Sequence, residues 1–340
     1  MSKNSDTILG FSVGDPNGVG IEVILKSLTS DDLNHDFKSV LFSNYNLVKK
    51  QGSIFDLKCN FKQIENLDEA DYDCINIINI DDNDFDINFG QSNKAGGEHS
   101  YKSLLGAINH LKKKEIHGLI TAPINKNNIQ SDFFKFKGHT DFLESCFDGD
   151  SLMFMVSENL KVALLTEHIP INEVAKSISS SLIEKRIHIV NQSLKKDFGI
   201  KNPKIAMLSI NPHVGDGGVI GNQDDLVLIP TTNSVRAKDI DVLGPYASDS
   251  FFGSSLYKSF DAVVAAYHDQ GLIPFKTMTF GNGVNFTAGL EIVRTSPDHG
   301  TAYDIAGKGI ASYTSFLKAL LLAREVFNNR LNKKTTSIVI

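Results

Sequence analysis

The sequence contains few cysteines, and they lack the spacing of metal or redox motifs. Only Cys59, Cys74 and Cys146 occur among 340 residues. The number is odd and no CxxC pair is present, which argues against a disulfide framework and a structural zinc site. Buried free thiols in a reducing cytoplasm are the simpler interpretation.

Long hydrophobic runs and an excess of positive charge are also missing. No apolar stretch reaches the roughly 18 residues of a membrane span, and the N-terminus has no apolar signal core. The most apolar long segment, residues 316–327, is broken by charged side chains and predicts an amphipathic helix. The formal net charge of −6 argues against nucleic acid as a main partner. We therefore expect a cytoplasmic protein that binds neither membranes nor nucleic acid.

The common nucleotide and hydrolase motifs are absent as well. GDPNGVG (residues 14–20) and GDGGVIG (residues 215–221) are rich in glycine, but neither fits GxGxxG with the acidic residue that follows it. GKG at residues 307–309 lacks the spacing and the Ser or Thr of a P-loop. No GxSxG elbow occurs, and no cysteine lies in a nucleophile motif. A standard Rossmann domain and a P-loop are therefore not supported.

Short apolar, β-branched runs alternate with helix-periodic segments. This pattern predicts an α/β fold, in which helices cover a mostly parallel sheet, and the length suggests two domains. Helices are expected at residues 101–112, 183–194 and 313–331. Strands are expected at residues 7–13, 39–43, 74–80, 119–121, 162–166, 205–210 and 262–266.

Polar residues that could bind ligands or take part in catalysis come just after five of these strands. The segments are GDPNGVG, TAPINK, EH, NPHVGDGG and YHDQG. In open α/β sheets, ligands bind outside the carboxyl ends of the strands. An ordinary polar loop explains any one of these segments, but the five together predict a ligand-binding rim.

Three histidines, His168, His213 and His268, each follow a different predicted strand. Neutral imidazoles brought to one rim form a divalent-metal site with open positions for substrate or water. A lone histidine at a strand end is more often a hydrogen-bonded loop residue. The metal hypothesis therefore depends on the convergence of all three, which spacing alone does not give.

Cationic and amide side chains suggest a site for an anion. Lys276, Asn285 and Arg294 lie within one stretch and could hold a phosphate or carboxylate. The alternative, which spacing alone slightly favours, is a solvated lysine and an arginine in a surface ion pair. His139 and Thr140 open a predicted helix, where backbone N–H groups suit an anion; a plain threonine cap is the simpler reading.

Taken together, the motifs resemble the 4-hydroxythreonine-4-phosphate dehydrogenase family of pyridoxal phosphate biosynthesis. The resemblance runs from about Gly10 to Ser312 and is carried by GDPNGVGIE, TAPINK, GHTDFLE, TEH, INPHVGDGG, GPYASDSFF, YHDQGLIPFK and VNFTAGLEIVRTSPDHGTAYDIAGKG. NPHxGxGG and YHDQG followed by lysine are the most specific of these. SPDHGTAYDIAGKG is also similar to the adenosine-binding loop of isopropylmalate and isocitrate dehydrogenases.

That similarity implies their fold, which has two α/β/α lobes with a central cleft. The lobes would be discontinuous: residues 1–130 and 265–340 would bind the cofactor, and residues 131–264 would carry metal, substrate and dimer contacts. NAD would be held by His299, Gly300, Asp304 and Ile305. A carboxylate at Asp304 accepts from a ribose 2′-hydroxyl and repels a 2′-phosphate, so NAD should be preferred over NADP.

The resemblance also implies residue roles. His168, His213 and His268 would hold one divalent ion, with zinc, magnesium, cobalt and manganese all possible. The active site would form at a homodimer interface, with metal ligands from both subunits. Metal-bound water, Asp269 and Lys276 remain candidates for the general base, and Asp249 and Asp269 either meet the substrate's amino group or serve as structural hydrogen-bond partners. The substrate contacts would be His139, Thr140, Lys276, Asn285 and Arg294.

The implied reaction is an NAD-dependent oxidation of 4-phosphohydroxy-L-threonine. The product, 2-amino-3-oxo-4-phosphooxybutanoate, would lose CO2 to give 3-amino-2-oxopropyl phosphate. Departures from the family pattern leave open a related substrate, such as 4-phosphothreonate, 4-phosphoerythronate or another small hydroxy acid. They are Asn17, Ile21, Tyr246, Ala247 and Pro297. A phosphotransferase or acyltransferase on a similar fold, or a non-catalytic binding protein, would be the alternatives from other classes.

Overall fold

The computed structural model describes residues 7–338, with side chains described as far as residue 332. The chain divides into two compact units. The first contains the residues up to Gly149 together with Leu290–Phe327, and the second contains Asp150–Gly289 and the residues from Asn328 on. Both units are thus discontinuous in sequence.

The observed units differ from the predicted lobes in three segments. Residues 131–149 belong to the first unit, whereas residues 265–289 and those from 328 on belong to the second. Packing explains the difference at residues 265–289, because Phe286 lies fully buried against the ring of Phe198, at a centroid distance of 5.8 Å. The first six and last two residues of the predicted lobes lie outside the described residues.

The first unit is built around six parallel strands in the order β3-β4-β2-β1-β5-β12. The strands are β1 (Ile8–Ser12), β2 (Lys38–Ser43), β3 (Phe61–Ile64), β4 (Ile75–Asn79), β5 (Gly118–Thr121) and β12 (Arg294–Pro297). The helices are α1 (Gly20–Leu28), α2 (Tyr45–Ile54), α3 (Lys94–Lys112), α4 (His139–Cys146) and the part of α10 (Thr314–Ile338) up to Phe327, with a short 3-10 turn η1 (Leu67–Glu69).

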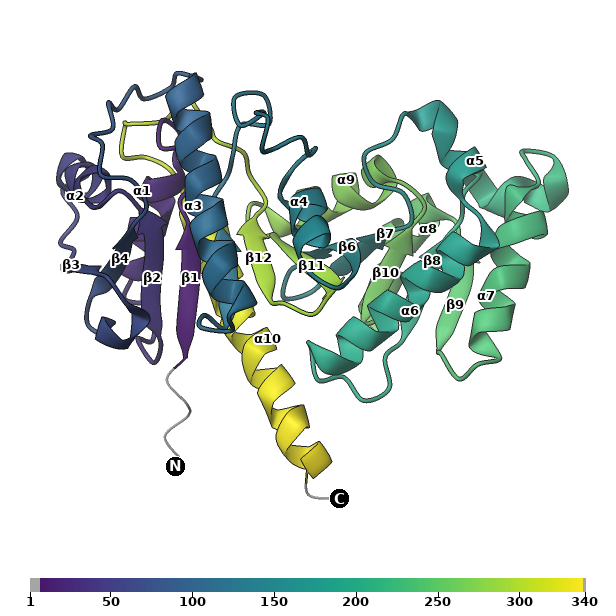
Figure 1. Ribbon diagram of the computed structural model, residues 1–340. Coiled ribbons are helices and arrows are strands. Elements are labelled where there is room, and N and C mark those ends of the chain that lie inside the picture. Colours follow the sequence, from purple (N-terminus) through teal and green to yellow (C-terminus); the bar gives the residue numbers. More distant parts are fainter. Residues whose placement is uncertain (1–6, 339–340) are drawn as a thin grey trace. The chain divides into compact units, whose positions relative to one another are not determined.

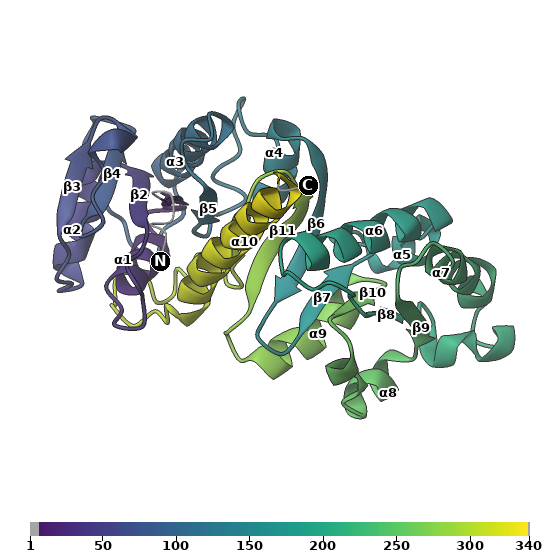
Figure 2. The same ribbon diagram turned by 90° about the horizontal axis from the view of Figure 1, so that it is seen from below.

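Helices cover both faces of this sheet (Figures 1 and 2). In Figure 2, α3 and α10 lie on opposite sides of the strands. On the α10 side, Phe11 of β1 stacks on Phe316 at a centroid distance of 6.2 Å. Helix α3 begins at a cap, because the side chain of Asn93 accepts a hydrogen bond from the backbone N–H of Gly96 at 2.8 Å.

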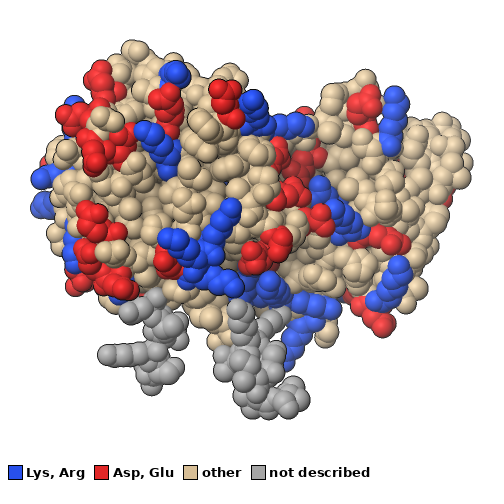
Figure 3. Space-filling view, in the orientation of Figure 1, with Lys and Arg blue, Asp and Glu red and all other residues tan. Residues whose placement is uncertain are grey.

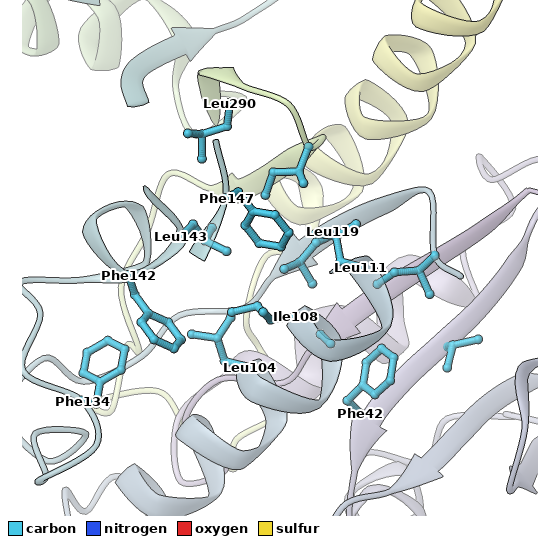
Figure 4. Close-up of a cluster of buried hydrophobic side chains, with 14 of the residues drawn as sticks. Phe42, Leu104, Ile108, Leu111, Leu119, Phe134, Phe142, Leu143, Phe147 and Leu290 are labelled. Atoms are coloured by element: carbon cyan, nitrogen blue, oxygen red, sulfur yellow. The ribbon is translucent and has the colours of Figure 1, made fainter. Parts of the chain in front are cut away.

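A cluster of apolar side chains joins α3, α4 and the sheet (Figure 4). Leu104, Ile108 and Leu111 recur at helical spacing along α3 and pack toward Phe42 and Leu119 of the strands. Phe142 and Leu143 of α4 belong to the same cluster, so this packing holds α4 in place, and α4 opens with two of the predicted substrate contacts.

Replacing Phe134 with alanine should destabilise the protein strongly, whereas the same change at its neighbour Phe133 should not. Phe134 is fully buried against Phe136 and Phe142, and Phe133 is 76% exposed. Deleting a buried phenyl ring costs about 3–5 kcal/mol, and a surface truncation changes the free energy of unfolding by only about 0.5 kcal/mol. Urea unfolding of the full chain measures both, and equal losses for the two variants would contradict this packing.

The second unit is built around β11-β6-β7-β10-β8-β9, in which β6 runs antiparallel to β7 and the pairs from β7 to β9 are parallel. The strands are β6 (Gly149–Val156), β7 (Lys161–Leu164), β8 (Ile205–Leu208), β9 (Val242–Tyr246), β10 (Ala262–Ala265) and β11 (Val284–Leu290). The helices are α5 (Val174–Ser177), α6 (Ser180–Lys196), α7 (Ile229–Arg236), α8 (Ser248–Gly253) and α9 (His268–Thr279), and the short turns are η2 (Ile171–Glu173), η3 (Pro212–Gly218), η4 (Asp224–Leu228) and η5 (Leu256–Ser259).

Helix α9 lies unusually close to this sheet. A Cβ atom on Gly271 would come within 2.8 Å of Val162 and 2.9 Å of Leu164, so only glycine permits the approach. Leu272 and Phe275 then bury their side chains against β7, β8 and β10. Helix α6 covers the other face, as Figure 2 shows. Close packing thus fixes α9, which carries three residues of the predicted site, His268, Asp269 and Lys276.

The structure confirms the predicted α/β class and all seven predicted strands to within two residues at either end. The predicted helices are present but longer, since α3 begins at Lys94 and α6 at Ser180. The cysteines are free, as expected, but partly exposed rather than buried. Burial still raises the pKa of the Cys59 thiol to about 11, which makes it a poor nucleophile.

Two surface properties bear on the predicted partners. No helix within residues 7–338 combines the length and the hydropathy that crossing a bilayer requires. On the face drawn in Figure 3, lysine and arginine side chains are interspersed with aspartate and glutamate side chains.

Candidate active site

In the second unit, parallel pairing brings four strand ends to one edge. β7, β10, β8 and β9 are neighbours that run in the same direction, so their carboxyl ends meet. His168, His268, His213 and Asp249 each follow one of these strands within five residues. This part of the predicted rim is therefore present within a single unit.

The side chain of Gln270 connects three of the strand ends. Its Oε1 accepts a hydrogen bond from the backbone N–H of Ala266 at 2.6 Å, and its Nε2 donates to the carbonyl of Ser209 and the hydroxyl of Ser248, both at 2.7 Å. These residues follow β10, β8 and β9, respectively. The hydroxyl of Thr166, after β7, donates to the carbonyl of Ala266 at 2.8 Å. Sequence reasoning missed Gln270, although it lies in the YHDQG motif.

Two of the three predicted metal ligands lie together. The ring centroids of His168 and His268 are 5.5 Å apart. Nδ1 of His268 is 2.7 Å from Oδ1 of Asp269. A carboxylate on one ring nitrogen orients the imidazole and leaves the other nitrogen available, as in many metal centres. This chemistry fits a divalent ion with two nitrogen ligands from these residues.

His213 lies apart from that pair, in the strained turn η3. His213 through Gly218 all have positive φ values. The fully buried Asp224 anchors the segment just before this turn, because its carboxylate accepts from the backbone N–H groups of Ile210 and Asn211 at 2.8 and 2.9 Å. Within the described residues, no three His, Cys, Asp or Glu side chains form a group that could hold a metal. The predicted convergence of all three histidines is therefore not found there.

In the first unit, Arg294 lies buried at the start of β12. Its exposed fraction is 2%, and its Nε and Nη2 atoms donate to the hydroxyl of Thr121 at 3.1 and 2.7 Å. Burial lowers the pKa of Arg294 to about 9. A guanidinium at this position can bind an anion such as a phosphate or carboxylate. The surface ion pair that spacing alone slightly favoured is thus wrong for Arg294.

His139 opens α4 in the same unit. Burial lowers its pKa well below the usual value, and the nearby charges of Arg294 and Lys126 lower it further. Its Nε2 atom is buried and has no hydrogen-bond partner among the described residues. Thr140 follows as the next residue of the helix. A neutral imidazole and two cationic side chains thus act on one region at the carboxyl end of β5, which suits a phosphate.

The other predicted contacts belong to the second unit. Lys276 is exposed on α9, and Asp249 and Asp269 are also exposed. Asn285 lies on β11, where its Oδ1 atom is buried without a partner among the described residues. The predicted substrate contacts are therefore divided between the two units.

The predicted cofactor residues lie on one loop of the first unit, between β12 and α10. We call residues 298–311 the cofactor loop. Nδ1 of His299 is 2.9 Å from the carbonyl of Gly300, while its Nε2 is buried without a partner in the described residues. No atom lies within 4 Å of a Cβ built on Gly300. Asp304 is exposed. An unpaired ring nitrogen, open space and an exposed carboxylate fit a nucleotide.

Replacing Gln270 with leucine should destabilise the protein by about 2–4 kcal/mol, since each buried polar group left unpaired costs about 1–3 kcal/mol. The partners at stake are the N–H of Ala266, the carbonyl of Ser209 and the hydroxyl of Ser248. Leucine at the exposed Gln91 is the control and should leave the unfolding midpoint unchanged. If the two variants unfold at the same urea concentration, Gln270 does not hold these strand ends together.

Comparisons with known proteins complete the description. The family model described as pyridoxal phosphate biosynthetic protein PdxA matches residues 35–323. The chain is 41% identical to a 4-hydroxythreonine-4-phosphate dehydrogenase of Bacteroides thetaiotaomicron, with 99% of this chain and 93% of that protein covered. It is 38% identical to the protein of that name from a Sulfurihydrogenibium species, with coverages of 93% and 97%. A solved structure of 4-hydroxythreonine-4-phosphate dehydrogenase from Klebsiella pneumoniae is similar with a TM-score of 0.84, 29% identity and coverages of 96% and 99%.

Proposed function

The chain belongs to the PdxA family of pyridoxal phosphate biosynthetic proteins, and we propose that it oxidises 4-phosphohydroxy-L-threonine with NAD. The product would be 2-amino-3-oxo-4-phosphooxybutanoate, which loses CO2 to give 3-amino-2-oxopropyl phosphate. The observation that carries this proposal is the buried Arg294 beside the neutral His139, because it forms a site for a compact anion such as a phosphate ester.

In this proposal the anion site holds the phosphate of the substrate. Arg294 can grip two phosphate oxygens, as guanidinium groups commonly do. His139 stays uncharged, so its Nε2–H tautomer donates a hydrogen bond without adding a further buried charge. Thr140 and Lys276 would add further contacts, and Asn285 would meet the polar groups of the substrate.

The spacing along α9 separates the roles of Asp269 and Lys276. Seven residues span two turns, so the two side chains leave the same face of the helix about 10 Å apart. Asp269 lies beside the imidazole pair, since its carboxylate contacts His268. We propose that Asp269 takes part in proton transfer from the substrate hydroxyl, and that Lys276 binds the phosphate. Asp249 remains a candidate partner for the substrate's amino group.

NAD, when bound to the cofactor loop, accepts the hydride. A divalent ion such as zinc, magnesium, cobalt or manganese, when bound at His168 and His268, lowers the pKa of the substrate hydroxyl. Because this pair supplies two nitrogen ligands, a third donor has to come from elsewhere, and a homodimer with shared metal ligands meets that requirement. A cytoplasmic location completes the proposal.

Purified protein should form NADH from NAD and 4-phosphohydroxy-L-threonine, and EDTA should abolish the activity. Adding back zinc or magnesium should restore it, because the ion stabilises charge on the reacting oxygen. NADH absorbance follows the reaction, and incubation without substrate is the control. A signal with 4-phosphothreonate alone would keep the mechanism and change the substrate. No signal with either substrate would refute the proposal.

Replacing Asp304 with lysine should narrow or invert the preference for NAD over NADP. The carboxylate repels a 2′-phosphate and accepts from a 2′-hydroxyl, whereas lysine favours the phosphate. Asp84→Lys is a matched control, because it makes the same charge change at an exposed position outside the cofactor loop. The readout is the ratio of kcat/KM values for the two cofactors. If Asp304→Lys leaves that ratio as in the unmodified enzyme, Asp304 does not face the ribose.

A further inference from the structure

The fully buried carboxylate of Asp15 lies at the centre of a hydrogen-bond cluster in the first unit. Oδ1 accepts from the backbone N–H of Asn17 at 2.9 Å. Oδ2 accepts from the side-chain amide of Asn128 and from the hydroxyl of Tyr303, both at 2.7 Å. A buried carboxylate needs such donors to remain ionised. Because Tyr303 immediately precedes Asp304, the cluster reaches the middle of the cofactor loop.

The hydroxyl of Tyr303 serves this cluster as a donor. Burial and the neighbouring Asp15 raise the pKa of Tyr303 to about 12, so the phenol keeps its proton at neutral pH. Hydrogen bonds to a charged acceptor are stronger than those between neutral groups. The contact joins residues 288 positions apart in the chain.

The segment that follows Asp15 also holds both ends of the cofactor loop. Near one end, the backbone N–H of Val19 donates to the carbonyl of Thr301 at 3.0 Å. At the other, the backbone N–H of Ala311 donates to Oε1 of Glu22 at 2.9 Å. Nζ of Lys26 donates to the carbonyl of Gly309 at 2.9 Å. Residues 19–26 therefore hold the loop at three places, in addition to the contact between Asp15 and Tyr303.

Glycines in the supporting segments let the cofactor loop approach closely. A Cβ on Gly18 would lie 2.6 Å from the carbonyl oxygen of Thr301, and one on Gly90 would lie 2.8 Å from that of Tyr303. Both distances are shorter than any ordinary contact. In the motif GDPNGVG, Gly18 thus leaves room for the backbone of the cofactor loop at Thr301.

We propose that Asp15 and Tyr303 are positioning residues for the nucleotide cofactor. Their hydrogen bond sets the path of the cofactor loop, so that His299 and Asp304 are already in place when NAD binds. A loop held in its binding conformation loses less entropy on binding. Asn128 extends the support, since its amide also donates to the carbonyl of Asn93 at 3.0 Å, at the start of α3. This inference rests on the proposed function.

Tyr303→Phe removes only the hydroxyl and tests the proposal. The dissociation constant for NADH, measured by fluorescence titration, should rise at least about tenfold, the effect of losing one hydrogen bond to a charged group. KM for NAD should rise in parallel, whereas kcat and KM for the phosphorylated substrate should change less than about twofold. Tyr101→Phe is the control, because its ring packs in the apolar cluster of the same unit.

A double-mutant cycle distinguishes positioning from general destabilisation. Asp15→Asn should weaken NADH binding, and adding Tyr303→Phe to it should weaken binding little further, because the two groups act through one bond. Amide hydrogen exchange of residues 299–308 should accelerate in Tyr303→Phe. Additive effects, or an unchanged dissociation constant with a lowered unfolding temperature, would overturn the inference. If the unmodified protein does not bind NADH, the proposed function fails instead.

Discussion

Parallel strands end with polar backbone groups that must be paired, and in each unit one side chain beyond a strand end helps to pair them. In the first unit Asp15, just beyond β1, binds a backbone group of its own turn and side chains from two other segments. In the second unit Gln270, just beyond β10, binds groups from three strand ends. Both residues can therefore be necessary for the arrangement of the site without contacting a ligand. Some of the predicted binding residues lie on the segments that these two side chains hold, among them His268 and Asp304.

Burial gives the first unit its affinity for an anion. Arg294 is buried and the Nε2 atom of His139 is buried as well, and burial disfavours the charged form of each side chain. The imidazole responds by losing its proton, while the guanidinium remains charged even with a pKa of about 9. The guanidinium could therefore bind a phosphate, and the hydroxyl of Thr121 orients it.

Local pattern predicts the strands well, because a buried parallel strand is a short apolar run between turns. It misses β3, β6, β9, β11 and β12. In the last two, residues 284–297 mix glycine, threonine and arginine with apolar residues. It also fails for contacts between distant residues. Nothing near Asp15 indicates a partner 288 positions away, and GDPNGVG reads as a nucleotide loop that lacks its fingerprint. The histidines could be found from their place after strands, but their convergence depends on the backbone of η3.

The left-handed backbone of η3 limits where the side chain of His213 can lie relative to the other histidines. Left-handed conformations cost roughly 1 kcal/mol or more for each non-glycine residue, and His213, Val214 and Asp216 all adopt them. Such strain persists only where neighbouring structure imposes it, and Asp224 anchors the preceding segment. His213 is therefore directed by its loop rather than by attraction to the other imidazoles. A metal centre that uses all three histidines would therefore depend on where this loop places His213.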